Sequence, residues 1–325
     1  MHKVHWQTAS WNQKSPLRWL LSPFSGLFRL ITGARRFAFR RGWLKSQQLL
    51  VPVIIVGNIT VGGSGKTPLV LWLAQTLKQQ GWRPGIISRG YGGHARVYPL
   101  IVTDHIRAEQ CGDEPKLLAL RSHCPVVVAP DRVAAGRQLL AEFDCNVIIS
   151  DDGLQHYRLQ RDLELVVVDA RRQFGNGFCL PAGPLREPIS RLNNVDFVIW
   201  HGEITADWSM HLQLCDAVNL LDQTRRPLTE WHGKTVHAVA GIGDPSRFFR
   251  QLQNAGLQVI EHAFTDHHHY TSADLQFGDT LPVLMTEKDA VKCQIFKIAN
   301  CWAVPAEAVV TGGLADAIDR RLKEQ

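Results

Sequence analysis

Residues 51–77 read VPVIIVGNITVGGSGKTPLVLWLAQTL, and this stretch decides the fold class. Its first part, 51–57, is a short apolar run rich in β-branched residues, which is typical of a buried parallel strand. A glycine-rich loop follows, and the apolar run over 68–77 predicts a helix that ends near Gly81. A strand, a glycine-rich loop with Gly-Lys-Thr and a helix, in this order, predict a phosphate-binding loop (P-loop). The sequence therefore predicts an α/β protein with a P-loop NTPase-like α/β/α core.

The loop offers the groups that a nucleotide needs. Glycines let successive backbone N–H groups turn inward around a phosphate, and the following helix adds partial positive charge at its N-terminus. Lys66 would reach the β- and γ-phosphates of ATP, and the Thr67 hydroxyl would bind Mg²⁺. Position 60 departs from the usual pattern, because it is threonine where a glycine is expected. The alternative is a plain glycine-rich turn before a helix. The residues expected to hold the nucleotide are Thr60, Gly62, Gly63, Ser64, Gly65, Lys66 and Thr67.

Two acidic residues follow another apolar run, 146–150. Asp151 and Asp152 stand at the carboxyl end of this expected strand, and a carboxylate there lies next to the P-loop if the two strands are neighbours. We interpret both as Mg²⁺ ligands, with Asp151 the stronger candidate. A pair of turn-forming aspartates is the alternative. Asp169 repeats the pattern after a further strand and is a weaker candidate.

The net charge of +6 is divided unevenly along the 325 residues. Residues 1–103 hold 14 Lys and Arg and no Asp or Glu, whereas 104–325 hold 22 basic and 30 acidic residues, which gives net charges of +14 and −8. With 45% apolar and 20% charged residues, the chain is neither disordered nor collagen-like. The seven scattered cysteines show no zinc-type spacing and indicate a reducing compartment. No apolar run is long enough for a spanning helix, and no signal peptide is recognisable.

The stretch 16–45 predicts a basic amphipathic segment. Its apolar residues between Leu17 and Ile31 recur at spacings of three and four, and arginines fall on the other side of the same helical wheel. Ser22-Pro23 is typical of a helix start, so we expect a short turn and then a longer helix rather than one continuous rod. Arginine with tryptophan and phenylalanine, and no acid, favours a helix lying on an anionic membrane surface. The alternatives are a helix packed on the protein and a nucleic-acid-binding segment, of which the second is the least favoured.

The second half shows a different pattern. Residues 235–243, 245–255 and 257–264 predict a strand, a helix and a strand, which form one right-handed βαβ unit. Three consecutive histidines (267–269) follow. Because neighbours in sequence cannot all face one ion, we expect one functional histidine and two surface ones, and three solvated histidines are the alternative. We divide the chain into a membrane-surface helix region, a P-loop core and a smaller C-terminal α/β lobe, with the bounds 1–50, 51–200 and 201–325.

Seven motifs occur in order over most of the chain. They are GNITVGGSGKTP (57–68), SRGYGG (88–93), GDEP (112–115), DDGLQH (151–156), GPLREP (183–188), DHH (266–268) and MTEKDA (285–290). With these motifs the chain resembles the tetraacyldisaccharide 4′-kinase family, the lipid A 4′-kinases of Gram-negative inner membranes, whose pattern includes the threonine at position 60. The resemblance implies two α/β/α lobes with the active site between them. It also implies transfer of the γ-phosphate of ATP to the 4′-hydroxyl of a tetraacylated glucosamine disaccharide 1-phosphate.

The resemblance also implies roles for single residues. From the residues alone, Asp113 is an acid in the first turn of an expected helix, where capping is the favoured interpretation. The resemblance makes it the expected base and His267 its partner, with His268 as an alternative to His267, and Lys66 takes part in catalysis. Asp151, Asp152 and Thr67 are implied on the Mg²⁺ side. The expected partners are ATP, Mg²⁺, the acylated lipid and the cytoplasmic face of the inner membrane, to which the protein binds peripherally through its N-terminal helix, without nucleic acid. Substrate or nucleotide contacts without assigned roles are expected at Tyr91, His156, Arg186 and Glu187.

Two other classes of protein share part of this pattern. A membrane-recruited P-loop ATPase switch of the partitioning type has a similar loop and a basic amphipathic helix, but it would not need Asp113, His267 or the proline-rich loop 181–188. A soluble small-molecule kinase would not need the N-terminal helix. ATP-dependent phosphorylation of the acylated disaccharide separates the three.

Overall fold

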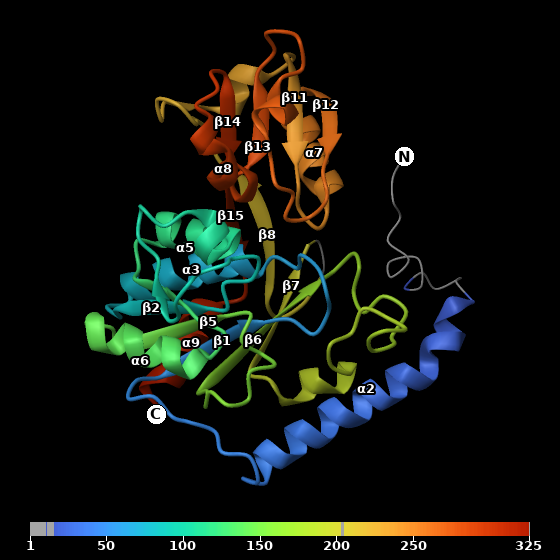
Figure 1. The fold of residues 1–325 in the computed structure, drawn as a ribbon, viewed down its shortest axis with the longest axis vertical. Coiled ribbons are helices and arrows are strands. Elements are labelled where there is room, and N and C mark those ends of the chain that lie inside the picture. The colour runs from blue at the N-terminus through green and yellow to red at the C-terminus, as the bar shows by residue number, and fades with distance from the viewer. Residues whose placement is uncertain (1–10, 12–15, 203–204, 325) are drawn as a thin grey trace.

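Two β-sheets organise the protein, and each has helices on both faces. The computed structural model describes residues 11, 16–202 and 205–324. Figure 1 shows the larger lobe at the bottom, the smaller lobe above it, and helix α2 (Leu17–Arg40) along the lower edge. The α/β/α architecture with a second, smaller α/β lobe agrees with the fold class expected from the sequence.

The larger sheet has nine strands in the order β15-β8-β7-β6-β1-β5-β2-β4-β3. Its centre is parallel, since β1 pairs in parallel with both β5 and β6. Antiparallel pairs close its two ends, β3 with β4 and β15 with β8. The strand bounds are β1 (Val53–Gly57), β2 (Pro84–Ser88), β3 (Leu100–Ile101), β4 (Val126–Val128), β5 (Val147–Asp151), β6 (Leu163–Asp169), β7 (Phe197–His201), β8 (Ser209–Leu214) and β15 (Ala306–Val310).

Alternation along the strands builds a core on each face of this sheet. In β1, Ile54 and Val56 point into one apolar cluster, while Val53 and Ile55 point into the other. Such runs, apolar on both faces, are what a sheet buried by helices requires. The first face carries α3 (Lys66–Gln79), α5 (Asp113–Ser122) and α9 (Leu314–Lys323), and the second carries α6 (Arg132–Glu142) and the 3₁₀ helix η1 (Ile189–Asn194).

The smaller sheet has six strands in the order β10-β9-β14-β13-β11-β12. Phe248, Phe249 and Leu252 of α7 (Pro245–Asn254) pack on one face, and Ala290 and Cys293 of α8 (Glu287–Cys293) pack on the other. β11 and β12 pair in parallel around α7, as the expected βαβ unit requires. The strand bounds are β9 (Ala217–Asn219), β10 (Arg225–Arg226), β11 (Thr235–Ala240), β12 (Gln258–Ala263), β13 (Val283–Thr286) and β14 (Cys301–Val304); the short helices are α4 (Ala108–Cys111), η2 (Leu228–Trp231), η3 (Ser272–Leu275) and η4 (Gln294–Phe296).

The division between the sheets does not follow the expected boundary after residue 200. The chain leaves the larger sheet after β8, builds the smaller sheet, and returns through β15 and α9 to the larger lobe. β8 and β15 pair over five positions, from Ala306↔Leu214 to Val310↔Met210, and form the two-stranded connection between the lobes. Such a return is invisible to local patterns, because an antiparallel edge pair is specified by its partner strand.

Helix α2 is continuous from Leu17 to Arg40, which corrects the expectation of a break at Ser22-Pro23. Pro23 has no N–H to donate to the Trp19 carbonyl, but the Ser22 hydroxyl donates to that same oxygen at 2.8 Å. The serine therefore supplies the hydrogen bond that the proline removes, and the helix passes through.

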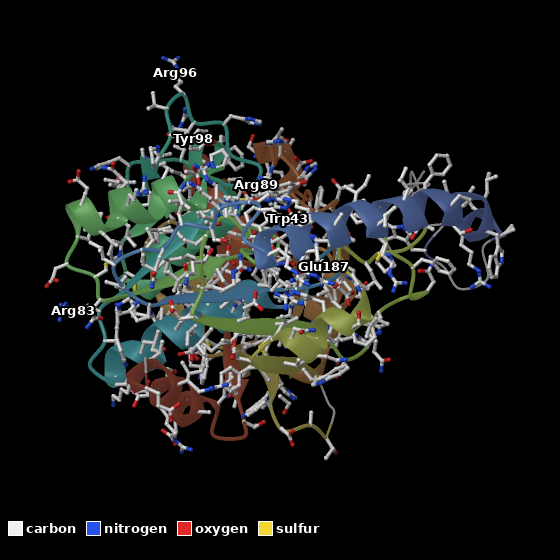
Figure 2. All side chains as sticks on the ribbon, turned by 90° about the horizontal axis from the view of Figure 1, so that it is seen from below. Trp43, Arg83, Arg89, Arg96, Tyr98 and Glu187 are labelled. Atoms are coloured by element: carbon white, nitrogen blue, oxygen red, sulfur yellow. The ribbon has the colours of Figure 1, made fainter. Side chains whose placement is uncertain are left out.

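Much of the apolar side of α2 faces solvent. Ser25 is buried and donates to the Cys179 carbonyl at 2.8 Å, which docks the helix on the larger lobe. Seen from below, the helix extends past the body of the protein (Figure 2). Among the residues that the structure describes, no helix combines the length and apolarity needed to cross a membrane. The exposed apolar side chains of α2 include Trp19, Leu20, Phe24, Leu27, Leu30, Ile31 and Phe37.

Candidate active site

A cavity of about 360 Å³ lies between the lobes, where the carboxyl ends of strands from both sheets face each other. The larger lobe contributes the P-loop after β1 and Asp152 after β5. The smaller lobe contributes Ile242 after β11, His267 after β12 and Lys288 after β13. Crevices at the carboxyl ends of parallel strands are where open α/β sheets bind ligands.

The P-loop occupies residues 58–67, between β1 and α3. Gly62 and Gly65 have φ of +102° and +97°, which residues with a Cβ rarely adopt. A Cβ on Gly65 would also lie 2.5 Å from His201 Nδ1. Asn58 closes the loop from inside by donating to the Ser64 hydroxyl at 3.0 Å. With Gly62, Ser64 and Gly65, the residues Gly63, Lys66 and Thr67 line the cavity, whereas Thr60 lies outside its wall and pairs with Leu185 in a short antiparallel bridge.

Lys66, Asp152 and Arg186 form one charged group at the floor of the cavity. Lys66 Nζ lies 3.5 Å from Asp152 Oδ1, and one nitrogen of Arg186 lies 3.1 Å from both Asp152 oxygens. Burial alone would raise the pKa of Asp152, but the charges of Lys66 and Arg186 outweigh it and lower that pKa. Asp152 is therefore an ionised carboxylate between two cations at the place where the phosphates of a nucleotide would lie.

Asp151 lies directly beneath this group, with 1% of its surface exposed. The parallel register places it beside Val56, at the end of β1, and so next to the P-loop. Burial and the negative charges of Glu114 and Asp152 raise the pKa of Asp151 to about 7. The Ser88 hydroxyl donates to Asp151 Oδ2 at 3.2 Å, while within the described part of the chain Oδ1 is buried without a hydrogen-bond partner.

An orphaned carboxylate oxygen at the end of the strand next to β1 fits a hard cation such as Mg²⁺. Among the described residues, no group of three or more His, Cys, Asp or Glu has the geometry of a metal site. Mg²⁺ does not require one, because it usually takes one or two carboxylates and completes its shell with water and phosphate oxygens. Asp169, the weaker candidate, is engaged elsewhere: it forms an ion pair with Arg247 of the smaller lobe.

Asp113 and His267 meet across the boundary between the lobes. Asp113 opens α5 in the larger lobe, His267 follows β12 in the smaller one, and His267 Nδ1 lies 3.2 Å from Asp113 Oδ2. Burial would raise the pKa of Asp113, but the hydrogen bond from His267 and the charges of Lys292 and Lys288 lower it. His267 lines the cavity, and Asp113 lies behind it. The pair therefore joins an ionised carboxylate to an imidazole that faces the P-loop.

A P-loop, a buried acidic pair and a histidine–aspartate pair near one cavity are the groups that a phosphoryl-transfer enzyme needs. Several known proteins are similar in sequence to this chain. The model of the family described as tetraacyldisaccharide-1-P 4′-kinase matches residues 17–323. The chain belongs to this family. The tetraacyldisaccharide 4′-kinase of Nitrosococcus oceani is 54% identical over 298 residues, which cover 91% of this chain and 88% of that one. That of Methylobacillus flagellatus is 50% identical over 321 residues, or 98% and 96% of the two chains.

A solved structure agrees with the fold of this tetraacyldisaccharide-1-P 4′-kinase family member. It is the "apo" form of LpxK from Aquifex aeolicus in complex with ATP, which is 34% identical and superposes with a TM-score of 0.81. The similarity covers 94% of this chain and 99% of that chain. Both lobes and their connection therefore belong to the shared fold.

In this family member the first two of the three histidines have different surroundings. His267 has φ of +60°, and its ring packs against Tyr91 at a tilt of 60°, with ring centroids 5.3 Å apart. Tyr91, which is largely exposed, also lines the cavity. His268 Nε2 instead lies 3.5 Å from Asp274, away from Asp113. The contact with Asp113 is thus made by His267, the first of the two alternatives.

Two of the expected contact residues lie outside the cavity. Glu187 is buried and accepts from the Tyr157 hydroxyl at 2.6 Å and from Gln155 at 3.0 Å, and Arg36 of α2 lies 3.5 Å from it. His156 faces Asp131 at 3.7 Å, and burial lowers its pKa to about 4. Arg186 faces the cavity and Glu187 faces α2, so this dipeptide connects the two.

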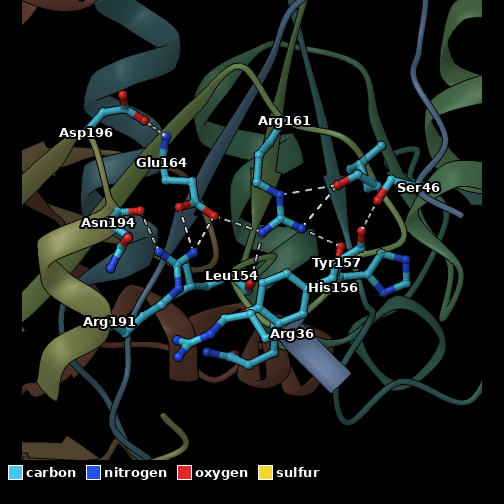
Figure 3. A network of polar contacts seen from close by, with 12 residues as sticks. Arg36, Ser46, Leu154, His156, Tyr157, Arg161, Glu164, Arg191, Asn194 and Asp196 are labelled. Atoms are coloured by element: carbon cyan, nitrogen blue, oxygen red, sulfur yellow. Dashed lines mark hydrogen bonds and ion pairs between the residues drawn. The ribbon is translucent and has the colours of Figure 1, made fainter. Parts of the chain in front are cut away.

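A buried ionic network fixes the loop that follows Asp152 (Figure 3). Glu164 of β6 pairs with both Arg161 and Arg191, and Arg191 reaches Glu187 at 3.3 Å. Arg161 also donates to the carbonyl oxygens of Leu154 and His156. The network holds the loop 153–161 against the strand ends, and so it positions the residues between α2 and the cavity.

Several cavity residues were not assigned from the sequence. Glu114 could be taken for a helix-capping acid, and Lys288 belongs to the quoted MTEKDA motif, but the sequence gives neither a contact. In the structure Lys288 Nζ bridges Glu114 of the larger lobe at 3.1 Å and Asp266 of the smaller lobe at 3.2 Å. Arg247 joins the wall from α7, and it lies 3.0 Å from His201. Of these residues only Lys288, two positions after the end of β13, could have been found from a strand-end pattern.

Proposed function

We propose that this chain transfers the γ-phosphate of ATP to the 4′-hydroxyl of a tetraacylated glucosamine disaccharide 1-phosphate. The observation that carries the proposal is that Lys66 of the P-loop and His267, the partner of Asp113, line the same cavity. A phosphate-binding cation and a base are thereby directed at one space. A kinase that phosphorylates a hydroxyl group needs both, whereas a switch ATPase needs only the first.

The reaction follows from these positions. The 4′-oxygen attacks the γ-phosphorus in line, the bond from that phosphorus to the bridging oxygen of ADP breaks, and the hydroxyl proton passes to the Asp113–His267 pair. The lowered pKa of Asp113 keeps the pair ready to take the proton at neutral pH. Lys66 and the backbone N–H groups of the P-loop stabilise the negative charge on the transferred group.

Mg²⁺ is part of the proposal. Thr67 and Asp151 would hold it, with Asp152 beside them: Thr67 and the ionised Asp152 line the cavity, and the unpartnered oxygen belongs to Asp151, the residue just before Asp152. When bound, the ion neutralises charge on the β- and γ-phosphates. Arg186 pairs with Asp152 in the structure, and a metal ion on Asp152 would release its side chain to turn to a phosphate.

The lipid part of the substrate fits the α2 side of the larger lobe. The exposed apolar residues of α2 offer a surface for acyl chains or for the membrane itself, and its arginines suit anionic headgroups. Arg36 reaches from this helix to Glu187, next to Arg186 at the cavity. We propose that the protein binds the cytoplasmic face of the inner membrane through α2 and takes its substrate there.

One assay tests the activity. Purified protein, ATP, Mg²⁺ and the tetraacylated disaccharide 1-phosphate should give a product heavier by one phosphate, detected by mass spectrometry, and the 4′-position should carry it. The same disaccharide without its 4′-hydroxyl is the matched control and should stay unchanged. ATP hydrolysis without a phosphorylated lipid would contradict the proposal and favour the switch ATPase.

The role of α2 has its own test. The full chain should bind vesicles that contain anionic lipid, and it should release them as salt rises, because the arginines contribute by charge. A chain truncated before Leu49 should lose this binding and retain nucleotide binding in the cavity. Equal vesicle binding by the truncated and full chains would refute the membrane role of α2.

A further inference from the structure

A second cavity, of about 190 Å³, lies behind the Asp113–His267 pair. His267 lines both this cavity and the larger one, whereas Asp113 and Lys292 line the second cavity only. Lys292 belongs to α8 of the smaller lobe. Lys292 therefore lies next to the Asp113–His267 pair but outside the nucleotide cavity, so it can influence the pair without contacting ATP.

The ammonium group of Lys292 is held in a fixed place. Its side chain is 9% exposed, and Nζ lies 3.4 Å from Asp113 Oδ2 and 3.3 Å from Asp289 Oδ1. The Tyr270 ring lies beneath it, with its centroid 5.0 Å from Nζ. Within the described residues, Nζ is buried and makes no hydrogen bond, so it interacts with its neighbours through its charge.

Asp289 anchors this lysine on its own lobe. Asp289 is fully buried, and its Oδ2 accepts from the Gly241 N–H at 3.0 Å and from the Thr286 hydroxyl at 2.6 Å. These bonds fix the carboxylate and leave Oδ1 facing Lys292. The smaller lobe thus holds the Lys292 ammonium group in a fixed position beside Asp113 of the larger lobe.

We propose that Lys292 is a positioning residue of the reaction, whose buried ammonium holds Asp113 ionised and oriented toward His267. The inference rests on the proposed kinase activity. A cation within about 4 Å of a carboxylate favours its charged form, and burial strengthens the attraction. Lys288, one helical turn earlier, differs because it lines the nucleotide cavity and pairs with Glu114 and Asp266.

The charges around Asp113 set the expected pH dependence. Burial raises the pKa of Asp113, and the hydrogen bond from His267 and the charges of Lys292 and Lys288 bring it below its ordinary value. Without Lys292 this pKa should rise by roughly one to two units. The other titratable groups at the pair or on its second cavity are Glu109, Cys111, Glu114, Asp266, His269, Tyr270 and Asp289.

The test is the pH profile of the Lys292→Met variant in the full chain. We expect its acid limb, in kcat and in kcat/KM for the acylated disaccharide, to move up by about one unit or more, so that kcat at a pH on that limb falls about tenfold or more. KM for ATP should stay within about twofold, because Lys292 is outside the nucleotide cavity. Lys292→Arg should restore most of the profile, since it retains the charge. Lys234→Met, at an exposed lysine of the same lobe, is the control.

Two outcomes overturn the inference. One is an unchanged acid limb in Lys292→Met, whether activity is normal or reduced equally at every pH, because that pattern belongs to a structural role. The other is a Lys292→Arg variant that is as impaired as Lys292→Met. If Lys292→Met does not fold, as judged by circular dichroism and ATP binding, Lys292→Gln replaces it in the same comparison. A wild-type chain that does not phosphorylate the lipid refutes the proposed function instead.

Discussion

The two ends of the interlobe cavity are built in opposite ways. The P-loop end is ten consecutive residues, 58–67, between one strand and one helix of a single lobe. The other end joins Asp113 of α5 to His267 and Lys292 of the other lobe, from places more than 150 positions apart in the chain. The first end exists as soon as one lobe folds. The second exists only while the two lobes stand in the right relation.

Interlobe contacts maintain that relation on both sides of the cavity. Near the pair, Arg121 of α5 binds Glu287 of α8, and Lys288 binds Glu114. Near the P-loop, Arg247 binds Asp169, and Arg172 donates to the Gly243 carbonyl. Nucleotide binding and proton transfer should therefore be separable in this fold. The P-loop belongs to the larger lobe alone, whereas the Asp113–His267 pair needs both lobes.

The largest effect should come from removing the Asp113–His267 pair, which forms the end of the cavity that needs both lobes. Asp113→Ala and His267→Ala should each lower kcat by about 10²- to 10⁴-fold, the range expected for lost acid–base catalysis. The dissociation constant for ATP should change little, because the P-loop is untouched. Turnover under saturating ATP and a separate measurement of ATP binding give the two values. Turnover within about threefold of wild type in both variants would exclude the pair as the base.

Lys66→Ala should disrupt the P-loop end and lower both turnover and ATP affinity. The loss of its charge weakens the hold on the β- and γ-phosphates and removes stabilisation of the transferred group, so kcat should fall by about 10²-fold or more while ATP also binds more weakly. Asp152 should remain ionised, since Arg186 still pairs with it. Calorimetric titration with ATP, beside the kinetics, separates this variant from the pair variants. Unaltered ATP affinity would contradict the assignment.

The same contrast explains what the sequence revealed about the site. The P-loop could be predicted because strand, loop and helix lie in one uninterrupted stretch. Residues alone left Asp113 a plausible helix-capping acid, and its proposed link to His267 came from a resemblance to a known family. Lys292 and Arg247 carried no signal, because neither spacing nor composition reports a contact between the lobes.

The fold shows the same division. Central strands such as β1 and β5 were recognisable as apolar runs, since burial on both faces demands them. The return of β15 to the larger sheet was not, because its pairing with β8 connects residues about 100 positions apart. The continuity of helix α2 was also not predicted. The Ser22 hydroxyl replaces the hydrogen bond that Pro23 removes, and a helix-start pattern does not anticipate this.

The smallest effect tests whether the P-loop conformation is fixed by the larger lobe alone. Gly65→Ala should lower the free energy of unfolding by about 2 kcal/mol, because a Cβ is strained at positive φ and would press on the His201 ring and on Met210. Gly63→Ala is the matched control: its Cβ would find its nearest neighbour, Gly243 of the other lobe, at 3.9 Å, so we expect a change below about 0.5 kcal/mol. Urea denaturation of both variants measures the difference. Equal stabilities would mean that the loop yields at Gly65, and its shape would then depend on the nucleotide rather than on the strand beside it.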